Sequence, residues 1–211
     1  MTSKVIMGAA AALSVFALSG AANAASVTFN SFVSNDSNPL GATVTITESG
    51  MNMFDVSLDL ADGDTGRLTG FYLGTSLDEP NDVRCSQLSF NASFDAPSCN
   101  DSGAPANNNS NLNGLIDNYA VFDFSLAYPQ QGNANYIDET DLPVVLFTIT
   151  SDMLTLADFE NVGLRFQASN APGGSEKLYD DNPMSPVPLP AAGFLLLAGL
   201  GGLAAARRRA N

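Results

Sequence analysis

Hydrophobic and polar residues alternate in short runs along the middle of the chain, between residues 25 and 170. In residues 42–47, Val44 and Ile46 fall on one face of an extended chain and three threonines fall on the other. Eight segments show such alternation or an enrichment in β-branched and aromatic residues: 26–33, 42–47, 53–60, 67–74, 88–94, 119–128, 144–150 and 162–168. These segments predict eight short strands.

A second alternating run carries larger side chains. Phe122, Phe124 and Leu126 share one face, and Asp123 and Ser125 point away from it. Turns rich in Gly, Asn, Asp and Pro separate the predicted strands, and no long helical pattern alternates with them. The sequence therefore predicts an all-β fold, an antiparallel β-sandwich of about eight strands with a jelly-roll-like winding.

Composition divides this middle part of the chain further. Residues 100–113 and 128–141 are rich in Asn, Gly and Pro, which predicts two long surface loops. Residues 151–159 fit one to three helical turns. We expect one β-sandwich domain over 25–170, followed by a Pro-, Gly- and Ser-rich linker over 171–186.

The first residues have the pattern of a secretory signal peptide. Lys4 precedes an apolar stretch over 5–18, and small residues follow it up to Ala24. Such an order predicts cleavage after Ala24, which makes Ala25 the first residue of the mature chain. Residues 1–24 therefore predict export through the Sec translocon and removal by signal peptidase.

The last 25 residues have a composition of their own. They contain the pentapeptide Val187-Pro188-Leu189-Pro190-Ala191, an apolar run over 191–206, and the basic end Arg207, Arg208 and Arg209. As a single hydrophobic helix the 16-residue run would be about 24 Å long, short of a hydrocarbon core of about 30 Å. The arginines favour the cytoplasmic side of a membrane. Together these parts predict a sorting signal. The alternatives are an ordinary C-terminal anchor and a hydrophobic tail that docks into the domain's own core.

This tail resembles the PEP-CTERM class of bacterial sorting domains in its VPLPA variant, and the resemblance covers residues 187–209. It implies that an exosortase-type membrane protease recognises the tail and cuts near the proline motif. It also implies an inner-membrane intermediate in a Gram-negative bacterium, followed by the cell surface or an extracellular matrix with its exopolysaccharide. Residues 64–74, 162–167 and 174–178 look like segments of the β-rich ectodomains that carry such tails. This likeness supports a β fold and indicates no catalytic residues.

The charge of the middle part excludes some functions. All 22 acidic residues lie between Asp36 and Asp181, against four basic residues in 25–186, which gives this part a net charge of −18. Nucleic-acid binding is therefore not expected. Because the chain has no histidine, His-dependent hydrolysis and His-based zinc sites are excluded as well. Two of the four cations, Arg165 and Lys177, are expected to form structural ion pairs.

One acidic group suggests a cofactor, with calcium as the candidate. Asp59, Asp62 and Asp64 lie in a Gly-containing turn, and calcium prefers several carboxylate oxygens at short spacing. The group does not follow the EF-hand spacing, so a solvated turn is the alternative.

The two cysteines outside the signal sequence, Cys85 and Cys99, predict a disulfide in an oxidising compartment.

Three functions stay open after these arguments. The favoured one is a non-enzymatic envelope or extracellular-matrix protein, sorted by its tail. The second is a module that binds calcium or carbohydrate. Without tryptophan, sugar stacking would fall to the tyrosines, which are Tyr72, Tyr119, Tyr128, Tyr136 and Tyr179. The third is a hydrolase that uses carboxylates alone, for which the sequence offers no specific pair.

Overall fold

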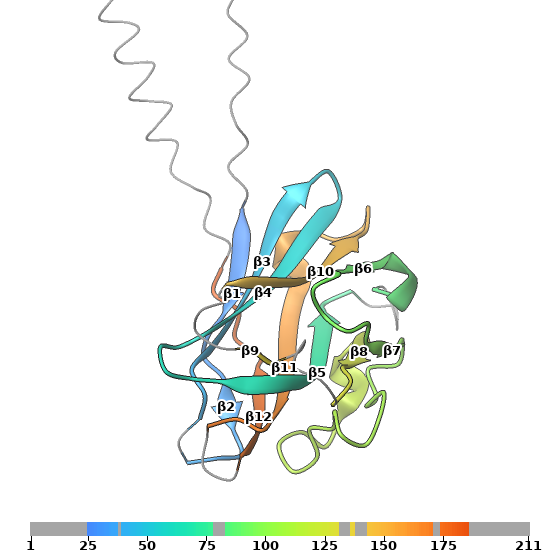
Figure 1. The fold of residues 1–211 in the computed structure, drawn as a ribbon. Helices are drawn as coiled ribbons and strands as arrows, with labels where there is room; N and C mark the ends of the chain where they lie inside the picture. The colour runs from blue at the N-terminus through green and yellow to red at the C-terminus, as the bar shows by residue number, and fades with distance from the viewer. Residues whose placement is uncertain are drawn as a thin grey trace, which may run out of the picture.

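The structure is a computed structural model that describes residues 25–37, 39–77, 83–130, 136–137, 143–170 and 174–185. Within these residues the fold is all-β, as predicted, with two antiparallel sheets (Figure 1). The first sheet has the order β1-β3-β4-β10-β6, and the second has the order β2-β12-β11-β5-β8-β7 with β9 paired to β5. The strands are β1 (Ser26–Phe29), β2 (Val33–Ser34), β3 (Ala42–Gly50), β4 (Met53–Leu60), β5 (Gly66–Thr75), β6 (Leu88–Phe90), β7 (Ser98–Asn100), β8 (Phe124–Ala127), β9 (Tyr136–Ile137), β10 (Val144–Thr150), β11 (Phe159–Gln167) and β12 (Ser175–Asp180).

The core lies between the two sheets. Val44 and Ile46 are buried on β3 while the intervening threonines are not, as the alternation predicts. From the other sheet, Phe71 of β5 meets Phe147 of β10 with ring centroids 5.1 Å apart. The inward faces of both sheets therefore form one hydrophobic core.

Several predicted strands are shorter or divided in the structure. Segment 26–33 splits into β1 and the start of β2, which belong to different sheets. Segment 88–94 keeps only the three residues of β6. Segment 119–128 becomes the 3-10 helix η2 (Tyr119–Val121) followed by β8. The helical turns expected in 151–159 reduce to the 3-10 helix η3 (Leu156–Asp158).

The outer face of the second sheet is covered rather than solvated. Residues 101–122, which we call the cover segment, lie over it, and Leu112 is buried in a second cluster with Tyr72 and Phe122. Asp123 and Ser125, which point away from the main core, are therefore buried as well. The prediction of a plain surface loop over 100–113 is wrong in this respect.

Glycines on β5 let the cover segment lie close to the sheet. A Cβ at Gly74 would stand 2.0 Å from the Val121 carbonyl oxygen, and one at Gly70 would stand 2.6 Å from that of Ser110. Both contacts are closer than van der Waals distance, so these two strand positions require glycine.

The prediction of a linker over 171–186 is wrong for the residues that form β12 and for Met184. Residues Ser175–Asp180 form β12, which pairs with β11 on one side and β2 on the other. Beyond β12, the Met184 N–H donates to the Thr28 carbonyl oxygen at 2.8 Å in an isolated antiparallel bridge. The domain therefore extends to at least Met184, well past the expected boundary at residue 170. The second expected loop, 128–141, likewise contributes β9, whose Ile137 is buried.

Candidate functional site

Most of the predicted sorting residues lie outside the described residues. These are Ala24, the motif Val187, Pro188, Leu189, Pro190 and Ala191, and the basic end Arg207, Arg208 and Arg209. Ala25 is the first described residue and Ser185 is the last. In the part of the chain that the structure describes, no helix has the length and apolar character needed to cross a bilayer.

The described chain enters and leaves the sandwich at the same end. The Ala25 carbonyl oxygen accepts from the Glu48 N–H at 3.0 Å, beside the end of β3. Because Met184 pairs antiparallel with Thr28, the chain after Met184 runs back toward Ala25. Figure 1 shows this end next to the β3–β4 hairpin. We call it the exit end and define it by Ala25, the hairpin residue Met51 and Ser185.

Two buried carboxylates on β12 hold the segment that crosses between the sheets. Glu176 accepts hydrogen bonds from the Ser34 hydroxyl at 2.5 Å and from the Leu40 N–H at 2.9 Å. Asp180 accepts from the Ser31 N–H at 2.8 Å. Buried carboxylates with such donors stabilise a fold, because an unpaired buried charge is costly. These two acids therefore have structural roles.

We expect Glu176→Leu to lower the free energy of unfolding by about 1–3 kcal/mol, because it leaves the buried Leu40 N–H without an acceptor. Urea denaturation followed by circular dichroism measures the change. Glu160→Leu, at an exposed position of β11, is the matched control and should change stability by less than about 0.5 kcal/mol. Equal effects of the two variants would contradict a structural role for Glu176.

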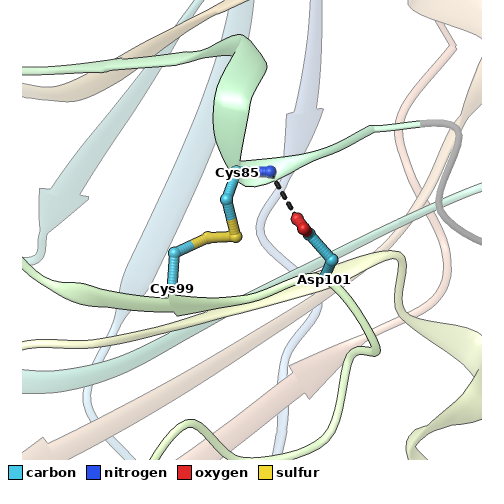
Figure 2. Close-up of side chains that lie close together, drawn as sticks. All are labelled: Cys85, Cys99 and Asp101. Atoms are coloured by element: carbon cyan, nitrogen blue, oxygen red, sulfur yellow. Dashed lines mark hydrogen bonds between the residues drawn. A yellow bond between two sulfur atoms is a disulfide. The ribbon is translucent and has the colours of Figure 1, made fainter.

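The cysteines form the predicted disulfide (Figure 2). Cys85 begins the 3-10 helix η1 (Cys85–Gln87) directly before β6, and Cys99 lies in β7, with an S–S distance of 2.06 Å. The Asp101 carboxylate accepts from the Cys85 N–H at 2.5 Å. Because β6 and β7 are edge strands of different sheets, the disulfide connects the two sheets at their edges.

The same three residues are the one group in the described chain whose geometry resembles a metal site. Ligand atoms of Cys85, Cys99 and Asp101 lie within 4.8 Å of one another. Metal ligation by cysteine requires thiolates, and here both sulfurs are bonded to each other. Asp101 already accepts a backbone hydrogen bond. The group is therefore a structural cross-link.

The candidate calcium ligands are not brought together in this way. Asp59 lies on β4 opposite Thr43, and Asp62 is exposed in the turn that follows. Asp64 accepts from the Gly41 N–H at 2.7 Å and so fixes the turn. The three carboxylates do not belong to any described group with metal-site geometry. The structure therefore does not bring these three carboxylates together, and a calcium site at Asp59, Asp62 and Asp64 stays a prediction.

Arg165 and Lys177 face each other on β11 and β12 but bond to carbonyl oxygens. The Arg165 guanidinium donates to the Glu176 carbonyl oxygen at 3.0 Å, and the Lys177 ammonium donates to that of Asn113. Burial lowers the pKa of both side chains, and the nearby Arg165 lowers the pKa of Lys177 further. Among the described residues the expected ion pairs do not form, and both cations instead hold backbone segments.

Tyr136 of β9 is the one exposed tyrosine of the described chain, at 36%, and the other four are buried or partly buried. Tyr72 and Tyr128 are buried, so neither offers a face to a sugar. Burial raises the pKa of Tyr72, whose hydroxyl donates to the Ser110 carbonyl oxygen at 2.7 Å. The Tyr119 hydroxyl accepts from the Leu112 N–H, and that of Tyr179 donates to the Asn161 side chain. The Tyr72 bond attaches the cover segment to the second sheet, the Tyr119 bond lies within the cover segment, and the Tyr179 bond joins β12 to β11.

Fold and site together define an all-β domain of two antiparallel sheets, which one disulfide cross-links at their edges. The chain enters and leaves this domain at the exit end. A scan against protein-family models gives no match, and searches of curated proteins and of solved structures give none either.

Proposed function

We propose that this chain is the precursor of a non-enzymatic protein of the bacterial envelope or extracellular matrix. It is exported by the Sec translocon, held in the inner membrane by its C-terminal tail, and processed there by an exosortase-type protease. The mature protein then acts at the cell surface or among exopolysaccharide. The VPLPA motif, the apolar run and the terminal arginines support this proposal from the sequence.

The structural observation that carries the proposal is the exit end. A precursor with a signal peptide and a C-terminal anchor is attached to one membrane from one side by both of its ends. The bridge between Met184 and Thr28 directs the chain after β12 toward Ala25, where the signal peptide is joined. The disulfide agrees with an oxidising compartment outside the cytoplasm.

The jelly-roll-like winding of the strands, expected from the sequence, stays a prediction.

The alternative, a calcium- or carbohydrate-binding module, has less support. Asp64 is engaged by the Gly41 N–H, and Tyr72 is buried beneath the cover segment. The hydrolase alternative also loses candidates, because Asp123, Glu176 and Asp180 accept structural hydrogen bonds.

Mass spectrometry of the protein from its native host tests the processing step. We expect the surface or matrix form to lack the peptide Arg207 to Asn211. Changing both Pro188 and Pro190 to alanine should leave a membrane-retained form with an intact C-terminus, because proline keeps the motif extended for the protease. Pro183→Ala, a proline change outside the motif, should be processed normally. An intact C-terminus on surface protein of the native sequence would refute the proposal.

A further inference from the structure

Methionine is distributed unusually in this domain. Methionine is apolar and is commonly buried, yet the described hydrophobic core contains none. All four methionines of the described chain are well exposed, at 91% for Met51, 41% for Met53, 65% for Met153 and 50% for Met184. The remaining two, Met1 and Met7, belong to the predicted signal peptide.

Three of the four exposed methionines, Met51, Met53 and Met153, lie at the exit end. Met51 and Met53 form the tip of the β3–β4 hairpin. Thr150, the last residue of β10, is the register partner of Met53, and the next residue, Ser151, donates its N–H to the Asn52 carbonyl oxygen at 2.9 Å. Met153 therefore lies beside the hairpin tip.

The fourth methionine, Met184, lies beside β1 at the level of the middle of the first sheet, before the chain reaches this end. Ser26 pairs with Thr47 near the end of β3, and Thr28, the bridge partner of Met184, is two residues further along β1.

The segments that join the exit end to the apolar sequences are short. Six residues separate Met184 from the start of the apolar run at Ala191, and six separate Ala25 from the end of the signal peptide's apolar stretch at Leu18. The seven Cα-to-Cα steps in each case span at most about 24 Å when fully extended. The linker first expected over 171–186 would have allowed more than twice this distance, but β12 incorporates much of it into the sheet. An anchored precursor must keep its exit end close to the bilayer.

We propose that the exit end, through Met51, Met53 and Met153, rests on the phospholipid surface of the membrane while the precursor is anchored. This inference rests on the membrane insertion of the tail proposed above. Flexible, unbranched thioether side chains can enter the boundary between headgroups and acyl chains without a fixed partner surface. The short connecting segments raise the local concentration of lipid, so weak contacts are sufficient.

The charges at the exit end define the preferred lipid. Glu48 and Asp152 are exposed next to the hairpin tip and to Met153. Their carboxylates repel anionic headgroups, so zwitterionic phosphatidylcholine or phosphatidylethanolamine is the favoured surface.

Methionine oxidation measures this contact directly, since a thioether that is covered by lipid reacts slowly with peroxide. The full chain is reconstituted into phosphatidylcholine vesicles with an added reporter, Asp62→Met, in the exposed turn after β4 at the opposite end of that strand from Met53. We expect Met51, Met53 and Met153 to oxidise at least about threefold more slowly than the reporter in peptide mass spectrometry. A control chain carries 20 added Gly and Ser residues in both connecting segments, and its methionines should oxidise like the reporter.

External trypsin separates the failure of this inference from the failure of the proposed function. Protected arginines at 207–209 show that the tail has crossed the bilayer. If they are protected and the exit-end methionines oxidise as fast as the reporter, the membrane contact is refuted while the sorting proposal stands. Cleavage of the arginines would refute tail insertion, and the membrane contact with it.

Discussion

Replacing Phe147 by alanine is expected to lower the free energy of unfolding by about 3–5 kcal/mol, the largest effect of any single change considered for this protein. Phe147 is fully buried on β10. Its ring lies 5.1 Å from Phe71 and 5.9 Å from Phe124, both of the opposite sheet, and 6.3 Å from Phe90 of the neighbouring strand. Its removal leaves a cavity at the point where the two sheets meet and ends three aromatic contacts at once.

Urea denaturation with circular dichroism measures this loss. Val145→Ala is the matched control, because Val145 lies on the same strand and is 38% exposed. The control should change stability by well under 1 kcal/mol. A loss below about 1 kcal/mol for Phe147→Ala would mean that the two sheets do not pack as described.

The second large effect is expected from the disulfide. Changing both Cys85 and Cys99 to serine should lower the free energy of unfolding by about 3 kcal/mol, the entropy estimate for a closed loop of this length. The bond closes residues 85–99 into a loop, which lowers the conformational entropy of the unfolded chain and so stabilises the folded state.

A reducing agent provides the control for this measurement. It should lower the urea midpoint of the native sequence to that of the double-serine variant and leave the variant unchanged. A native midpoint that does not respond to complete reduction would contradict a stabilising disulfide.

The sequence predicts the inward faces of the sheets well where buried positions are apolar. On β3, Val44 and Ile46 alternate with threonines, and the pattern has one interpretation. The disulfide was also predictable, because the chain has two cysteines and therefore one possible intramolecular pairing. These features depend on local pattern and composition alone.

β12 could not be predicted in the same way. Its inward positions are Glu176, Leu178 and Asp180, so two of the three buried side chains are carboxylates. Their donors at Ser31 and Leu40 come from the other end of the chain, and the sequence does not show such distant partners. Because the buried positions of this strand are polar, its sequence has the composition of a linker, and for this reason the strand was not predicted.

The candidate site was predicted only in part for a similar reason. The spacing of Asp59, Asp62 and Asp64 does not show that the first lies on a strand, the second projects from a turn and the third caps a backbone N–H. The cover segment was misjudged because its asparagines face solvent or one another while a single leucine, Leu112, fills the gap above Tyr72.

The place of β12 in the second sheet sets the order in which this protein can fold. The strand lies between β2 and β11. The second sheet therefore pairs Ser34, near the start of the described chain, with Leu178, near its end. Contacts of such sequence separation form late and slowly. A chain that passes N-terminus first through a narrow channel cannot close this sheet until residue 180 has emerged. By then only about ten residues precede the apolar run, so under the proposed export route the final folding step would coincide with arrival of the tail at the membrane.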